Sequence, residues 1–116
     1  EIDNMRTGLA QRRADFEDET DRRRSEEGED FDEEAYEFER SMMERRIQLE
    51  GQRIDNSEDY NRKLQELSSD PNTNDQDWKK LEGAQEDAFE ALDLKFQALD
   101  QESQEYWDTR HEDHDD

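Results

Sequence analysis

The residues with the clearest potential for chemistry lie at the C-terminal end of the chain. Asp108, His111 and His114 are spaced three apart, and Asp115 and Asp116 follow directly. Imidazole nitrogens and carboxylate oxygens are ligands for divalent transition metals, and a helix brings residues three apart close together. The same residues also fit a solvated acidic tail, which is the interpretation we adopt. The sequence therefore predicts no metal site and no cofactor.

Catalytic chemistry has no other support in the sequence. The chain has no cysteine, no glycine-rich phosphate loop, and no nucleophile with a histidine and an acid at a known spacing. Neither histidine has a glutamate three residues before it, as the metal-binding motif of ferritin-like bundles requires. Paired carboxylates are so frequent that a pair such as Glu33 and Glu37 says nothing about acid–base catalysis. We therefore predict a protein that is not an enzyme.

The composition is dominated by acidic side chains. Asp and Glu number 38 against 16 Lys and Arg, and the formal net charge is −22 at pH 7. The chain has few Leu, Ile and Phe residues and no Val, which leaves little apolar surface for an independent globular core. This charge argues against nucleic acid and anionic membranes as partners and in favour of a basic protein. No run approaches the ~20 apolar residues of a membrane span. We expect a soluble chain, secreted or not.

A turn near the only proline organises the chain. Pro71 disfavours helical geometry at the residue before it and cannot donate a backbone hydrogen bond, so a helix should end before it. The Ser, Asp and Asn residues around it bond to nearby backbone and favour turns. Thr73 and Gln76 fit a capping box that would start a new helix. The sequence thus predicts a turn over residues 68–75.

Apolar residues at helical spacing lie on both sides of this turn. They predict helices over residues 31–67 and 76–112, with the spacings of three and four that are typical of coiled coils. The fold class is therefore all-α, a long antiparallel helical hairpin with an N-terminal helical extension. Phe89, Leu94 and Trp107 fall off the main stripe and would widen it or face a second partner. The predicted interface residues are Phe31, Phe38, Met42, Leu49, Ile54, Leu64, Trp78, Leu81, Leu92, Phe96, Leu99 and Tyr106.

Residues 1–30 form a charged arm before the hairpin. Opposite charges four apart, such as Asp18 and Arg22, would each add a few tenths of a kcal/mol to a helix. Gly28 is a candidate break, with Ser25 or Asp30 as caps, but we expect the helix to continue through it. The arm has no partner within the hairpin, so it must fold back on the chain, stand free as a solvated single helix, or lie across a neighbouring subunit. Gly51, inside the first hairpin helix, is expected to mark a close approach of another helix.

Function is predicted from the seam and the charge together. We call the row of predicted interface residues the apolar seam. Two helices cannot cover both sides of this seam, so we expect a third or fourth helix to pack against the hairpin. We predict a structural protein that forms a homo-oligomer, as a bundle or filament, or a hetero-complex through helix packing. The alternative is an acidic binding protein (a DNA mimic, inhibitor or chaperone) that acts on a basic partner. From residue 76 onward there are 14 Asp/Glu against 4 Lys/Arg, and residues 113–116 are predicted to be an acidic tail.

Overall fold

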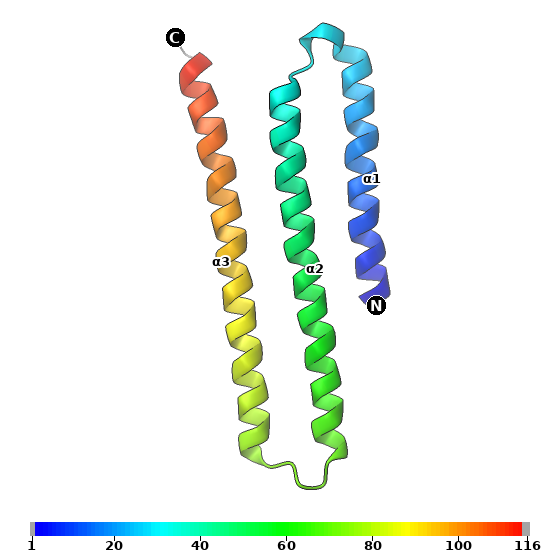
Figure 1. Cartoon of the computed structure of the whole chain (residues 1–116), viewed down its shortest axis with the longest axis vertical. Coiled ribbons are helices and arrows are strands. Elements are labelled where there is room, and N and C mark those ends of the chain that lie inside the picture. The colour runs from blue at the N-terminus through cyan, green and yellow to red at the C-terminus, as the bar shows by residue number, and fades with distance from the viewer. Residues whose placement is uncertain (1, 115–116) are drawn as a thin grey trace. The chain divides into compact units, whose positions relative to one another are not determined.

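The computed structural model describes the backbone of residues 2–114 and the side chains of residues 2–111. Over this part of the chain the fold is all-α, and the predicted helical hairpin with an N-terminal helical extension is confirmed (Figure 1). The chain divides between Gly51 and Gln52 into two compact units, here called the N-terminal and C-terminal units. The elements are α1 (Ile2–Glu27), a short 3-10 helix η1 (Gly28–Asp30), α2 (Glu33–Ser69) and α3 (Asp75–His114).

In the N-terminal unit, α1 and α2 are separate helices, so the prediction of one helix through Gly28 is wrong. Gly28 has a φ of 59°, a left-handed conformation that glycine adopts at little cost and that commonly ends helices. Phe31 is extended, and its N–H donates to the Gly28 carbonyl at 3.2 Å. Asp32, rather than Ser25 or Asp30, then caps α2, because its carboxylate accepts a hydrogen bond from the N–H of Ala35 at 3.0 Å.

The arm folds back on its own chain. Of the three placements left open for it, folding back is the one that the N-terminal unit shows, because α1 lies alongside the first part of α2 (Figure 1). The contact is aromatic: the rings of Phe16 and Tyr36 stack at 6.0 Å, and those of Phe31 and Tyr36 lie 5.8 Å apart. Thr20 is buried and its hydroxyl donates to the Phe16 carbonyl at 2.8 Å, which satisfies the polar group locally.

In the C-terminal unit, the predicted reversal at Pro71 is present. Residues 70–74 are non-helical, α2 ends at Ser69, and the first part of α3 runs alongside the second part of α2 (Figure 1). The carboxylate of Asp70 accepts the N–H of Asn72 at 2.9 Å, a local bond that favours the turn. α2 therefore ends two residues later than predicted, and the turn is shorter.

The capping box of α3 differs from the predicted one. Asn74 and Asp77 exchange two hydrogen bonds, each at 3.1 Å, from the backbone N–H of one residue to the side-chain oxygen of the other. The predicted partner Thr73 instead donates its hydroxyl to the Leu67 carbonyl, at 2.7 Å, and so satisfies the C-terminal end of α2. The box is displaced by one residue because Thr73 is used to close the preceding helix.

The core is thin in both units. The buried apolar side chains are Phe31, Ile47, Ile54, Leu92 and Leu99, and among the described side chains none is less than 2% exposed. A Cβ added at Gly51 would meet no heavy atom within 4 Å, so the expected close approach at this glycine is wrong. A contact between two helices buries one stripe of each helix and leaves the edges of that stripe exposed to solvent.

Replacing Gly28 tests the break between α1 and α2. Gly28→Ala should destabilise the chain by about 1–2 kcal/mol, because the left-handed conformation costs that much for a residue with a Cβ. Gly8→Ala is the matched control: it lies within α1 with nothing within 4 Å of an added Cβ, so it should stabilise by up to about 1 kcal/mol. Urea unfolding followed by circular dichroism measures both. Equal effects of the two substitutions would contradict the assigned break.

Candidate functional site

The predicted interface residues all lie on the covered or half-covered side of their helices. Phe31, Ile54, Leu92 and Leu99 are buried, and none of the twelve residues is exposed. The sequence missed buried Ile47, which falls where the stripe of α2 changes phase. That a partner covers the stripe stays a prediction. The half-buried members are Phe38, Met42, Leu49, Leu64, Trp78, Leu81, Phe96 and Tyr106.

The residues that fall off the stripe differ in exposure. Leu94 is 65% exposed and Phe89 is 36% exposed, both on α3, while Met5 of α1 is 51% exposed. Trp107 is half-buried and meets the ring of Tyr106 edge-on at 5.1 Å. Leu94 and Phe89 are therefore the large apolar side chains of α3 that are exposed to water among those described.

Arginine–carboxylate pairs join α1 to α2 in the N-terminal unit. The predicted pairs within α1 do not form: Asp18 and Arg22 have no ion pair in the described part of the chain, and the partners of the neighbouring arginines lie on α2. Side chains here are well exposed, so each pair is worth at most about 1 kcal/mol. The pairs are Arg13–Glu44 at 2.8 Å, Arg24–Glu33 at 3.1 Å, Arg40–Glu17 at 3.3 Å, Arg23–Glu39 at 3.8 Å, and Arg12–Glu50.

One of these arginines also lies against aromatic rings. The guanidinium carbon of Arg24 is 5.0 Å from the ring centroids of both Phe31 and Tyr36, while its Nη2 reaches Oε2 of Glu33 at 3.1 Å. A planar, weakly hydrated guanidinium combines a carboxylate contact with an aromatic contact more readily than an ammonium group does. Arg24 thus sits between acid and aromatic groups.

Arg53 makes a similar arrangement in the C-terminal unit. Arg53 of α2 places its guanidinium carbon 4.7 Å from the ring centroid of Phe96, and its Nη2 lies 3.0 Å from Oδ1 of Asp93. Asp93 and Phe96 are three residues apart on α3, so they lie on neighbouring turns of one side of that helix. We call Arg53, Asp93 and Phe96 the arginine cluster of this unit.

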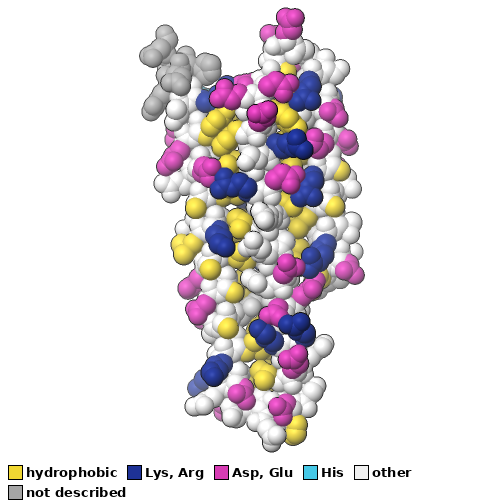
Figure 2. All heavy atoms as spheres, in the orientation of Figure 1, with side chains coloured by type: hydrophobic (Ala, Val, Ile, Leu, Met, Phe, Trp, Pro, Cys, Tyr) yellow, Lys and Arg dark blue, Asp and Glu magenta, His cyan; other side chains and the backbone are white. Residues whose placement is uncertain are grey.

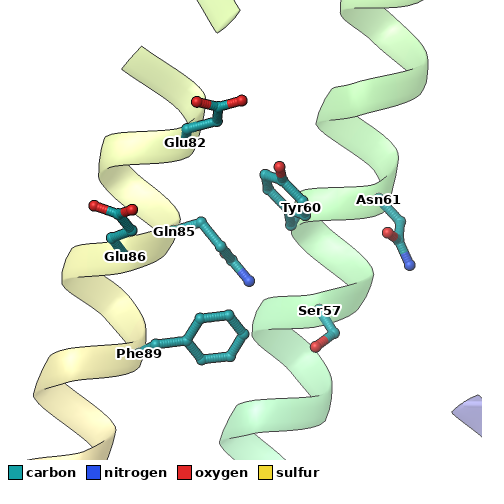
Figure 3. A pocket seen from close by; sticks show the side chains of 7 residues that line it. All are labelled: Ser57, Tyr60, Asn61, Glu82, Gln85, Glu86 and Phe89. Carbon is teal, nitrogen blue, oxygen red and sulfur yellow. The ribbon is translucent and has the colours of Figure 1, made fainter. Parts of the chain in front are cut away.

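An open hollow lies nearer the turn, between α2 and α3. Its volume is about 620 Å³, and Figure 3 shows Gln85 and Phe89 pointing from α3 toward α2, with Tyr60 reaching back toward α3. Glu82 and Glu86 lie on its α3 side and make no ion pair with any described residue. Carboxylates beside exposed ring faces are suited to a cation. The residues lining the hollow are Ser57, Tyr60, Asn61, Glu82, Gln85, Glu86 and Phe89.

The surface outside the hollow mixes both signs of charge. Figure 2 shows acidic and basic side chains interspersed over the face drawn, with hydrophobic side chains between them. The described residues contain no group of three or more His, Cys, Asp and Glu placed to hold a metal ion. Of the C-terminal residues that could do so by sequence, Asp115, Asp116 and the side chain of His114 lie outside the described residues, as does part of the predicted acidic tail. None of the described helices combines the length and apolar character needed to cross a membrane.

The class of protein is defined by the fold and the surface alone. No protein-family model, curated protein or solved structure matches the chain. The described residues define an all-α protein built from antiparallel helical hairpins, with a half-covered apolar seam and a hollow flanked by unpaired carboxylates.

The charges near the C-terminal end of α2 can be tested by titration. A hydrogen bond from Lys63, together with the charges of Lys63 and Arg62, lowers the pKa of Asp59. Because the folded-state pKa is depressed, the stabilisation is present above the unfolded value near ~3.9 and is lost as pH falls through the folded value. Carbon-detected NMR of the Asp59 carboxyl should give the lower pKa, and Lys63→Gln should move it upward. An unchanged Asp59 pKa in that variant would contradict the assigned cause.

The arginine cluster can be tested by a double-mutant cycle. Arg53→Gln, Phe96→Leu and the double variant should give a coupling of about 0.5–1 kcal/mol, the value of an exposed cation–aromatic contact. Urea unfolding is the measurement, and Arg62→Gln with Phe96→Leu is the control, because the ion pair that Arg62 makes lies with Asp59. Additive effects of Arg53 and Phe96 would show that the two side chains do not interact.

Proposed function

We propose that the chain is a non-enzymatic assembly protein. Its helical hairpin associates with copies of itself, or with helices of a partner, through the apolar seam. One observation carries the proposal: eight of the twelve seam residues are only half-buried by the chain's own helices. In a helical bundle, a third or fourth helix covers a row of apolar side chains that two helices leave half-buried.

Energetics support the need for further burial. Each Å² of apolar surface removed from water contributes about 25 cal/mol, and no described side chain is less than 2% exposed. Burial of the edges of the seam, and of Leu94 and Phe89, by a partner would therefore add stabilisation that the isolated chain lacks. A partner helix laid along α3 would gain it without any change in the fold.

Charge opposes self-association and sets its dependence on salt. Two copies with a formal charge of −22 repel one another at low ionic strength. Salt shortens the range of this repulsion, to about 10 Å at 0.1 M, and leaves apolar contact intact. Assembly of identical chains should therefore strengthen as salt is added.

A second candidate function is binding of a basic protein. The observation in its favour is a row of neighbouring carboxylates on α3 that have no ion pair among the described residues. They are Glu82, Glu86, Asp87 and Glu90, of which three repel at four-residue spacing. A cationic partner would relieve that repulsion, and its binding should weaken as salt is added.

The self-assembly proposal is tested by mass in solution. Light scattering at about 0.02 M and about 0.5 M salt should give a mass above the monomer that increases with salt. Leu94→Gln should lower this mass while helical circular dichroism is unchanged, because Leu94 is exposed in the single chain. Leu94→Met, which keeps the side chain apolar, is the control and should assemble normally. A folded monomer at both salt concentrations would contradict self-assembly.

A further inference from the structure

We propose that the hollow between Tyr60 and Phe89 binds the side chain of an arginine from a basic partner protein. The inference rests on the second candidate function, binding of a basic protein, and deepens it by naming the side chain that is bound and the residues that hold it. It is carried by a repeat within the hairpin rather than by the acidic residues alone.

The repeat has a period of seven residues. In the arginine cluster, Arg53 of α2 meets both Asp93 and Phe96 of α3. Positions seven apart in a helical hairpin of this kind return to the same side of the helix, two turns along. Because α2 and α3 are antiparallel, a step of seven toward the turn adds seven on α2 and subtracts seven on α3. An equivalent site is therefore expected two turns nearer the turn.

The equivalent site has the acid and the ring but not the arginine. Seven residues before Asp93 and Phe96 stand Glu86 and Phe89, and seven residues after Arg53 stands Tyr60. These three residues all line the hollow (Figure 3). Tyr60 supplies a second aromatic group where the cluster has its guanidinium. The hollow therefore lies where the repeat would put an arginine side chain, and the chain has Tyr60 there instead.

Charge and space fit this occupant. Glu86 and its neighbour Glu82 have no ion pair with any residue that the structure describes. The volume of about 620 Å³ lies within the range of about 300–1,000 Å³ in which proteins hold small ligands, so one side chain can enter. Phe89 is 36% exposed, which leaves an apolar ring accessible to a guanidinium plane.

Arginine fits better than lysine. A guanidinium is planar, stacks on rings and can contact two carboxylates through separate N–H groups, whereas an ammonium is strongly hydrated and offers a point charge. The chain uses arginine in this way at Arg24 and at Arg53. At low ionic strength a second copy of the chain is a poor donor of this arginine, because two chains of charge −22 repel.

Binding is tested with a defined probe, the tripeptide acetyl-Gly-Arg-Gly-amide. Proton–nitrogen NMR should show saturable shifts of the side-chain amides of Gln85 and Asn61, which line the hollow. The lysine tripeptide should bind about threefold more weakly or less, since it lacks the stacking contact. Absence of saturable shifts at Gln85 and Asn61 would overturn the proposal, as would equal binding of the two tripeptides.

Matched variants separate the hollow from general attraction to an acidic chain. Glu82→Gln with Glu86→Gln should weaken arginine-tripeptide binding about fivefold or more. Asp87→Asn with Glu90→Gln removes the same charge from the same helix outside the hollow and should leave binding within about twofold. Phe89→Leu should weaken it about threefold while it keeps an apolar side chain. Equal weakening by the two double variants would overturn the proposal.

Tyr60→Arg fills the hollow from within. This variant should remain helical and should no longer bind the tripeptide, because its own guanidinium would meet Glu86 and Phe89 as Arg53 meets Asp93 and Phe96. Tyr60→Gln, which removes the ring without adding charge, should retain measurable binding. Undiminished binding by Tyr60→Arg would overturn the proposal.

Failure of the inference can be told apart from failure of the function. A long polyarginine, measured against wild type and both double variants, reports binding to the acidic surface as a whole. If it binds all three proteins equally, the acidic-binder function stands and the hollow is not the site. If it does not bind wild type at low salt, both the function and the inference are wrong.

Discussion

The physical constraint on which the structure depends is that a contact between two helices covers one stripe of each. A stripe is enough to hold α2 against its neighbour within each unit, but it leaves most seam residues half-buried, and among the described side chains only five apolar ones are buried. Such a fold gains little from burial per residue. The remaining specificity must come from turns, caps and charges, which are local or short-ranged.

Arginine side chains combine the charge contacts and the packing contacts between the helices. In the N-terminal unit arginines of α1 reach carboxylates of α2, and Arg24 adds two aromatic contacts. In the C-terminal unit one arginine, Arg53, joins α2 to α3 in the same manner. Exposed pairs of this kind contribute little stability individually, yet they select which residues face each other. A chain with a surplus of acid cannot satisfy every carboxylate in this way, and carboxylates without an ion pair among the described residues lie on α1 as well as on α3.

The binding site proposed for the hollow near the turn would arise from this arrangement without any new fold. One residue of a seven-residue repeat, at Tyr60, is aromatic instead of cationic. The carboxylate and ring that would have held an internal arginine stay available to an external one. The proposed apolar docking and the proposed cation binding share the exposed ring of Phe89, so a partner that lies along α3 would also cover the hollow.

The sequence by itself determined what depends on local chemistry. Residue propensity made the chain all-α, Pro71 and its polar neighbours placed the reversal, and the apolar spacing identified the covered side of α2 and α3. It did not determine the break at Gly28, since glycine is tolerated inside helices as well as after them, nor the shift of the capping box to Asn74. Only the tertiary structure decided that α1 folds back, that its arginines pair with α2 rather than within α1, and that Tyr60 of α2 and Phe89 of α3 line one hollow. The reason is that propensities and caps act within a few residues, whereas such pairings depend on the register between helices, which no single helix encodes.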